Sequence, residues 1–316
     1  MLALCYFCIQ GILHDGQEVA IKRLSTNSRR VAEFKNEALL IAKLQHTNLV
    51  GLLGFCIQGE ENILIYEYMP NKSLDSFLFD SDKKKILNWK RHFIIIEGIA
   101  QGLLYLHKYF KLRVIHRDYL KASNILIDNE MNPKISDFGI ARIFGLNESE
   151  ANTNRVVGTY GYMSSKYVLH DLVSIRTDVF SFGVLLLEVV TGWKNTAHYH
   201  PDYPLNLTGY VCQLWNEGRQ LGLIDPSMDG SCPHDEILRC IHIGLLCVQD
   251  HAVDKPTILD VVSMLSNKTI QLPEPKYPGV FITSKVEKEG SVLEVKQEIC
   301  SINQVSILEM EARWLR

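Results

Sequence analysis

The side chains that can do chemistry fall into four groups along the chain. A lysine ends Val19-Ala20-Ile21-Lys22, and Glu37 follows it. Farther on come His116-Arg117-Asp118 with Lys121 and Asn124, and then Asp137-Phe138-Gly139. Together these types offer a cation for anionic groups, a carboxylate that can accept a proton, and oxygen ligands suited to a hard metal ion such as Mg²⁺. Each group alone is a weak signal, but the four together in this order are not a chance arrangement.

Periodicity indicates which elements carry the first two groups. Residues 17–24 alternate between apolar and polar types and predict a strand that includes Lys22. Residues 31–44 predict a helix, since Phe34, Ala38 and Ile41 fall on one face. Two β-like runs follow, at 49–57 and 62–68. The first part of the chain is therefore expected to form strands around one helix.

The rest of the chain predicts mainly helices. Residues 89–107 carry an apolar stripe, and 180–190 are apolar almost all round, which is typical of a helix at the centre of a helical lobe. Further helical patterns span 207–217 and 235–266. The long, glycine-punctuated stretch 136–174 predicts a functional loop. The order indicates an α+β fold in two lobes, with the junction near residues 67–70.

Composition excludes several classes of protein. Of the 316 residues, 47% are hydrophobic and 22% charged, so the chain can bury a core and is not a disordered protein. The net charge of −3 gives no electrostatic footprint for nucleic acid. No apolar run reaches the roughly 18 residues of a membrane-spanning helix.

The ends and the cysteines add little chemistry. The apolar residues 1–13 lack the basic start and cleavage site of a signal peptide, and predict a buried strand or a frayed end. Cys5 and Cys8 form a C-x-x-C with no second pair to complete a zinc site. Cys240 and Cys247 fit one helical pattern as core thiols, which indicates a reducing compartment. From Asn267 onward the composition predicts a mobile tail.

This motif set resembles that of the protein kinases, and the chain looks closest to plant receptor-like kinases of the S-locus, or G-type lectin, group. The stretches that carry the resemblance are DGQEVAIKRLS (15–25), HTNLVGLLGFC (46–56), LIYEYMPNKSLDSFLFD (64–80), MNPKISDFG (131–139), GTYGYM (158–163), TDVFSFGVLLLEVVTG (177–192) and NQVSILEMEAR (303–313). The resemblance implies a bilobal protein-kinase-like fold, with a small β-rich N-lobe with one helix at 11–68 and a larger helical C-lobe at 69–268. Residues 1–10 do not match, and residues 269–316 are expected to be a flexible tail.

The resemblance also implies roles for residues that match the family's motifs. Lys22 would hold the α- and β-phosphates of ATP, and Glu37 would fix its ammonium by an ion pair. Asn124 and Asp137 would bind Mg²⁺. Asp118 would accept the proton of the attacking hydroxyl, and Lys121 would steady the γ-phosphate.

Further roles concern the adenine and the long loop. The backbone of Glu67, Tyr68 and Met69 would take the adenine, behind a bulky Tyr66. Lys121 together with Thr159 indicates serine or threonine acceptors. Arg117 would clamp a phosphate on the long loop, with Thr153 or Ser149 as candidate sites.

Four features depart from the family pattern. No glycine-rich phosphate loop precedes Gly11, so the backbone amides that cover the phosphates are missing. The catalytic loop has one residue too many between Asp118 and Asn124, a spacing that a bulge at Tyr119 could absorb. Lys166 and Lys255 stand where the family places the two partners of a buried ion pair, so one of them would be forced toward water.

Three hypotheses therefore stay open. The first is an active serine/threonine kinase that uses Mg-ATP and protein substrates. The second is a pseudokinase that acts as a scaffold with little turnover. The third is an N-terminally truncated product in which the first ten residues replace the true N-terminal strands. The expected location is cytoplasmic, whereas full-length relatives lie in the plasma membrane with the kinase on the cytosolic side; self-association is left open.

Overall fold

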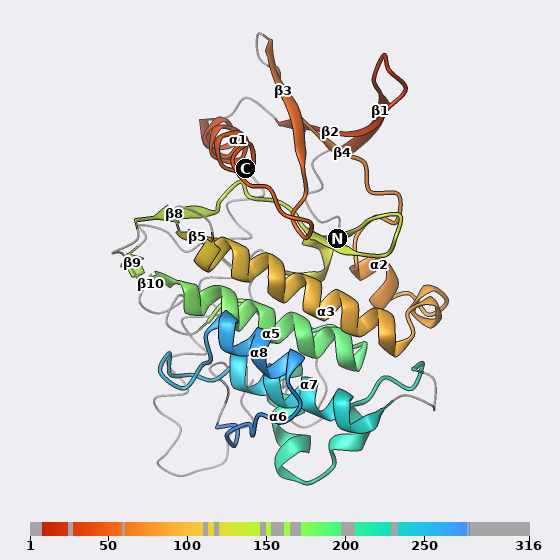
Figure 1. The fold of residues 1–316 in the computed structure, drawn as a ribbon, viewed down its shortest axis with the longest axis vertical. Helices are drawn as coiled ribbons and strands as arrows, with labels where there is room; N and C mark the ends of the chain where they lie inside the picture. Colours follow the sequence, from red (N-terminus) through yellow and green to blue (C-terminus); the bar gives the residue numbers. More distant parts are fainter. Residues whose placement is uncertain are drawn as a thin grey trace, which may run out of the picture.

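The chain folds into a sheet-bearing lobe above a stack of helices, as the computed structural model shows (Figure 1). The structure describes residues 8–24, 28–58, 61–109, 113–116, 120–145, 150–152, 161–164, 172–196, 206–228, 233–276 and 278. The expected α+β architecture in two lobes is confirmed. Within the described residues, no helix has both the length and the apolar character needed to cross a bilayer.

The small lobe is an antiparallel sheet with one helix against it. Its elements are β1 (Cys8–Ile12), β2 (Glu18–Leu24), α1 (Ser28–Ile41), β3 (Leu52–Gln58) and β4 (Glu61–Glu67), and the strand order is β1-β2-β4-β3. Side chains alternate along β4, so that Leu64 and Tyr66 are buried, and Lys22 of β2 lies opposite Leu64. This register brings the lysine to the buried, inner part of the lobe.

The strand expected within residues 1–13 forms at Cys8–Ile12, but the expectation that it is buried is wrong. Ile9 and Ile12 are 54% and 71% exposed. The physical reason is position, because β1 pairs only with β2 in the described sheet and lies at its edge.

The large lobe contains the remaining elements. They are α2 (Asp75–Leu78), η1 (Lys83–Ile86), α3 (Trp89–Leu104), η2 (Tyr105–Tyr109), β5 (Arg113–Ile115), η3 (Ala122–Asn124), β6 (Ile125–Ile127), β7 (Pro133–Ile135), β8 (Arg142–Phe144), β9 (Glu150–Asn152), β10 (Leu172–Ser174), α5 (Ile175–Thr191), α6 (Leu207–Asn216), η4 (Gln220–Leu223), α7 (His234–Cys247) and α8 (Ile258–Ser266). The pattern over 235–266 is two helices, because the chain turns at Asp254-Lys255-Pro256 and proline cannot continue a helix.

Helix α5 is the centre of the large lobe, as its all-round apolar pattern predicts. Every residue from 177 to 191 is buried. Ser174 caps the start of the helix in a reciprocal capping box, and Gly192 ends it at φ 68°. Helix α7 crosses so closely that a Cβ on Gly183 would lie 2.6 Å from that of Cys247. The glycine is therefore required for this crossing.

The core thiols expected on α7 are confirmed. Cys240 and Cys247 are 1% and 0% exposed. Burial raises the pKa of both thiols, so they remain protonated and act as small apolar side chains.

Part of the expected flexible tail is packed against the helical lobe. His242 of α7 shares a hydrogen bond with the Pro273 carbonyl, and Gln249 exchanges hydrogen bonds with the backbone of Lys276. Pro273 and Lys276 are therefore attached to the folded lobe, because His242 on α7 and Gln249 just after it bond to their backbone, whereas residues 279–316 lie outside the described residues.

Candidate functional site

Lys22 is the centre of a buried ionic cluster where the two lobes meet. Its Nζ lies 2.8 Å from Glu37 Oε2 of α1 and 3.0 Å from Asp137 Oδ1. Lys22 and Glu37 are 6% and 1% exposed, so these charges interact in a poorly hydrated environment. Three of the predicted site residues, from a strand, a helix and the long loop, are thus in direct contact.

Tyr66 adds a hydroxyl to this cluster. Its Oη donates to Glu37 Oε1 at 2.6 Å, so each oxygen of the Glu37 carboxylate has a donor. The pKa of the Glu37 carboxyl is raised above its ordinary value, mainly by burial. Lys22 and the tyrosine hydroxyl act in the opposite direction but do not cancel this effect. For Asp137, burial acts to raise the pKa but is outweighed by the Lys22 ammonium, which holds the pKa of that carboxyl below its usual range.

A short hairpin brings Asn124 beside Asp137. Strands β6 and β7 pair with Ile125 opposite Ile135, so the residue before one strand faces the residue after the other. The Asn124 carbonyl accepts hydrogen bonds from the Ser136 backbone and hydroxyl at 2.9 and 2.8 Å. Asn124 and Asp137, an amide and a carboxylate, therefore both come from the same end of the hairpin. Their oxygen atoms fit a divalent cation such as Mg²⁺, which completes its coordination with water and phosphate oxygens.

Asp137 adopts a conformation that is uncommon for its residue type. Its φ is 64°, in the left-handed region. Backbone strain of this kind persists only where surrounding contacts hold it, and it is concentrated at functional sites. Lys121 is near enough to lower the pKa of Asp137, so a second cation faces this carboxylate.

The segment that leads into the catalytic loop is anchored on α5. The His116 backbone N–H donates to Asp178 Oδ2 at 2.8 Å, and the same oxygen contacts His107 Nε2 at 2.9 Å. The His116 ring packs edge-on against Phe138 and contacts the Ser136 carbonyl. Burial lowers the pKa of His116, so this ring is neutral.

The connection after β4 is held at both ends. Glu67 Oε1 accepts from the Gly51 backbone at 2.7 Å and lies 3.0 Å from Lys134 Nζ. Met69 is buried, and its carbonyl accepts from the Lys72 N–H at 3.1 Å. Tyr68 between them is half-buried. The predicted adenine-binding segment is thus a fixed stretch of chain between the lobes.

Other predicted site residues fall outside the described residues. They are Arg117, Asp118, Ser149, Thr153 and Thr159, together with the inserted Tyr119 and Lys166. Both flanks of the catalytic loop are described, however. His116 and Leu120 are fully buried, and Asn124 lies next to Ser136 in spite of the insertion.

The end of the long loop is tied to α5. Tyr162 Oη donates to Glu188 Oε2 at 2.6 Å, and Ser181 Oγ donates to the Tyr162 carbonyl at 2.8 Å. Lys255, which the sequence pairs with Lys166, is 4% exposed; its Nζ lies 3.4 Å from the Asp250 carbonyl and 5.3 Å from the centre of the Phe180 ring. Lys255 therefore lies inside the lobe, whereas Lys166 falls outside the described residues.

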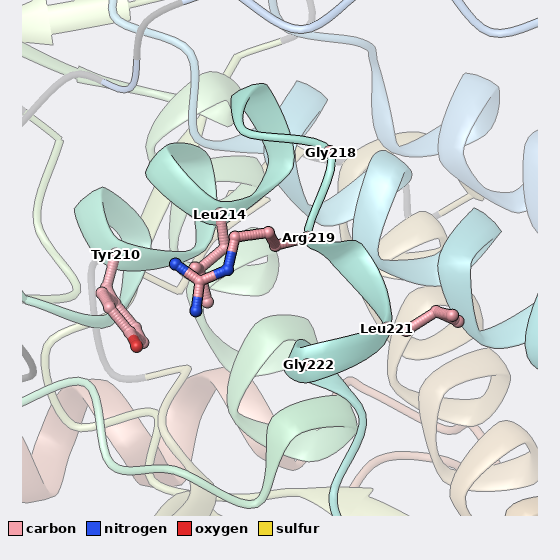
Figure 2. Close-up of a pocket in the computed structure, with 6 residues that line it drawn as sticks. All are labelled: Tyr210, Leu214, Gly218, Arg219, Leu221 and Gly222. Atoms are coloured by element: carbon pink, nitrogen blue, oxygen red, sulfur yellow. The ribbon is translucent and has the colours of Figure 1, made fainter.

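A separate pocket lies far from this chemistry in the sequence. It has a volume of about 250 Å³ and lies between α6 and η4 (Figure 2). Tyr210, Leu214 and Arg219 surround it in the view, and none of the predicted site residues lines it. The pocket is thus distinct from the cluster around Lys22.

Two contributors to the site were missed from the sequence. Asn36, beside Glu37, donates from Nδ2 to the carbonyls of Phe138, Gly139 and Ala141. Asp178 lies in the stretch 177–192 that carries the family resemblance, but its link to His116 has no local sequence pattern. Asp178 stands beside the buried apolar run of α5, which was an available signal, whereas Asn36 lies between two charged residues and has no such mark.

Comparison with known proteins gives one consistent result. Residues 8–221 match the family model described as protein tyrosine and serine/threonine kinase. The chain is 52% identical over 307 residues to cysteine-rich receptor-like protein kinase 10 of Arabidopsis thaliana, covering 96% of this chain and 46% of the relative. It is 56% identical over 311 residues to the G-type lectin S-receptor-like serine/threonine-protein kinase CES101 of the same plant, covering 96% of this chain and 36% of the relative.

A third relative, the G-type lectin S-receptor-like serine/threonine-protein kinase SD1-13 of Arabidopsis thaliana, is 52% identical over 309 residues. That match covers 96% of this chain and 36% of the relative. The chain thus spans between about a third and a half of the length of these curated relatives.

Proposed function

The chain belongs to the protein tyrosine and serine/threonine kinase family, and on that premise we propose that it transfers the γ-phosphate of ATP to serine and threonine hydroxyls of proteins. The observation that carries the proposal is the position of Lys22, within 3.0 Å of both Glu37 and Asp137. Phosphoryl transfer depends mainly on positioning and charge neutralisation, which such a cluster can supply.

We assign the phosphate-holding role to Lys22. A flexible ammonium needs a fixed partner to keep one position, and Glu37 supplies it through a 2.8 Å contact. Tyr66 occupies the other oxygen of Glu37, so that carboxylate is held on both sides. Lys22 is then positioned to neutralise the α- and β-phosphates.

Asn124 and Asp137 are the residues that would hold Mg²⁺ in this proposal. A divalent cation there supplies neutralisation of the phosphate oxygens. The low pKa of Asp137 keeps its carboxylate ionised and ready to bind such a cation at neutral pH. The anchoring of Asn124 on Ser136 fixes the spacing between the two ligands.

The transfer step is assigned to the catalytic loop. Asp118 accepts the proton of the attacking hydroxyl, and Lys121 steadies the γ-phosphate. Thr159 is proposed to favour serine or threonine acceptors. Arg117 and Thr153 are proposed as a regulatory pair, in which a phosphate on the threonine is clamped by the arginine.

The binding and cellular context follow from the family. We propose that residues 11–68 and 69–268 are the two lobes, and that Glu67, Tyr68 and Met69 take the adenine between them. Because the relatives are named receptor-like kinases, we propose that this chain acts on protein substrates on the cytosolic side of the plasma membrane. Self-association would be a further property of such a receptor.

The alternative of a binding module without turnover rests on the four departures from the family pattern. No contact among the described residues favours it, since the insertion near Tyr119 leaves Asn124 beside Ser136 and the Lys22 cluster is assembled.

The proposal is tested by incorporation of labelled phosphate into a generic protein substrate and into the chain itself. We expect Mg-dependent incorporation on serine and threonine. The Asp118→Asn variant is the control, because it keeps the shape of the loop and removes the proton acceptor. Incorporation no greater than that of this variant would overturn the proposal.

A further inference from the structure

Asn36 of α1 holds the segment that follows Asp137. Its Nδ2 lies 3.2 Å from the Phe138 carbonyl oxygen, 3.1 Å from that of Gly139 and 2.9 Å from that of Ala141. An amide nitrogen carries two protons, so the three carbonyls share them. Because all three partners accept, only a donor fits at this position.

These carbonyls need hydrogen-bond donors, and not all of the donors come from their own segment. Phe138 and Ala141 are 0% and 5% exposed, so water has little access to them. The Ala141 N–H donates to the Phe138 carbonyl at 3.1 Å, which supplies one of the bonds. Asn36 supplies further ones, and without it buried acceptors would lose partners.

The neighbouring residue on the helix holds a different part of the site. Glu37 contacts Lys22 of β2 and Tyr66 of β4, whereas the Asn36 side chain donates to the loop after Asp137. The helix also lies against this loop directly, since a Cβ on Gly139 would be 3.5 Å from Glu33 Cβ. One turn of α1 therefore joins the sheet to the metal-binding end of the long loop.

We propose that Asn36 is a positioning residue that holds Asp137 in its left-handed conformation and thereby links the metal-binding carboxylate to α1. The φ of 64° at Asp137 needs surrounding contacts to persist. Asn36 fixes the carbonyls of Phe138, Gly139 and Ala141, which holds the Asp137 carboxylate against Lys22. The link to metal binding rests on the proposed function, whereas the first measurement below needs no ligand and tests the role of Asn36 by itself.

The test compares three variants of Asn36 with one control. Asn36→Leu keeps the volume and removes the donor, and Asn36→Asp puts an acceptor opposite three carbonyls. Asn36→Gln restores a donor on a longer side chain. The control is Asn71→Leu, which removes a similar bond, from Nδ2 to the Asp128 carbonyl at 2.6 Å, in another part of the large lobe.

The first measurement is amide hydrogen exchange of residues 137–142 without any ligand. We expect exchange there to be about tenfold faster in Asn36→Leu, faster still in Asn36→Asp, and partly restored in Asn36→Gln. The Asn71→Leu control should leave this segment unchanged. Exchange in Asn36→Leu within twofold of the natural chain would overturn the inference, whether or not the chain binds nucleotide.

The second measurement is nucleotide affinity with and without Mg²⁺. We expect Asn36→Leu to weaken Mg-ATP binding by about tenfold while changing metal-free ATP binding by less than about twofold, because the metal contact needs Asp137 in place, whereas Lys22 keeps Glu37 as a partner. Equal loss in both conditions would overturn the coupling to the metal. Failure of the natural chain to bind Mg-ATP would instead count against the proposed function, and the exchange result would still decide the role of Asn36.

Discussion

The two lobes of this chain differ in the interactions that stabilise each of them internally. In the large lobe, α5 is buried along its length and packs on α7 through two glycines. In the small lobe, many apolar side chains remain exposed, among them Ile12, Leu39, Phe55 and Ile57, and the ionic cluster of Lys22 is buried beside the apolar core. Apolar packing therefore gives the large lobe its stability, whereas charge pairing fixes the geometry of the small lobe.

Stability should therefore respond most to substitutions in the large lobe, and activity to substitutions in the small lobe. Of the fourteen large apolar side chains exposed among the described residues, seven lie in residues 8–58, although that lobe is the smaller one. Because it leaves more of its large apolar side chains exposed, this lobe is expected to contribute less to global stability, but it contains the lysine and glutamate of the site. Substitutions in each lobe can test this division.

The largest effect is expected from the core of the large lobe. Leu187→Ala removes a fully buried side chain that fills the space above Gly244, since a Cβ on that glycine would lie 2.7 Å from Leu187 Cδ2. We expect the free energy of unfolding to fall by about 2–5 kcal/mol. Chemical denaturation measures it. Leu221→Ala, at a leucine that is 62% exposed, is the matched control and should change stability little.

The next effect concerns activity. Lys22→Met keeps the length of the side chain but leaves Glu37 and Asp137 without their shared ammonium. We expect phosphate transfer to fall by about 100- to 1,000-fold, the scale for loss of one group that stabilises transition-state charge. Initial rates of substrate phosphorylation measure it, with Lys35→Met on the exposed face of α1 as the control. Equal loss of activity in the Lys22 and Lys35 variants would show that the loss does not come from the ionic cluster.

A pH-dependent effect is expected inside the large lobe. Burial raises the pKa of Glu188 to about 7 from its ordinary value of 4.5. The folded protein thus binds this proton more tightly than the unfolded chain does. The stability that this gives is complete below about pH 4.5 and is lost as the pH rises to about 7.

Glu188→Gln should therefore have a flatter stability profile. Relative to the natural chain, we expect the variant to gain on the order of 1–3 kcal/mol between about pH 5 and about pH 8. Unfolding midpoints measured across that range decide it. Glu274→Gln, at an exposed carboxylate, should follow the natural profile; parallel profiles for the Glu188 variant would show that the carboxyl has no raised pKa.

The smallest effect is expected at the exposed edge of the sheet. Ile57 is 59% exposed on β3, so Ile57→Thr keeps a β-branched side chain and removes little buried surface. We expect the free energy of unfolding to change by no more than about 0.5 kcal/mol. The same substitution at the fully buried Ile127 of β6 is the comparison and should cost several times more. Similar costs at the two positions would mean that the edge of β3 is covered.

Local patterns predicted the elements and much of the cluster from the sequence. Alternation placed Lys22 on a strand, helical periodicity placed Glu37 on α1, and the motif order brought Asp137 to the same family site. The all-round apolar run likewise indicated that α5 would be central. These features depend on neighbouring residues, which a single sequence displays directly.

The missed features depend on distant backbone groups. Asn36 contacts carbonyls more than a hundred residues away, and Asp178 contacts the backbone of His116. Such contacts are set by how segments far apart in the sequence pack together, so they leave no periodic pattern. The exposure of Ile12 was missed for the same reason, because an apolar strand looks alike at the centre and at the edge of a sheet.

The buried thiols of α7 have a practical consequence. A thiol reacts with alkylating reagents as its thiolate, and Cys240 and Cys247 are both shielded from solvent and held protonated. They can react only during moments when the helices around them separate. The rate at which a small maleimide modifies Cys247 would therefore report how often the interior of this lobe opens, without any engineered residue.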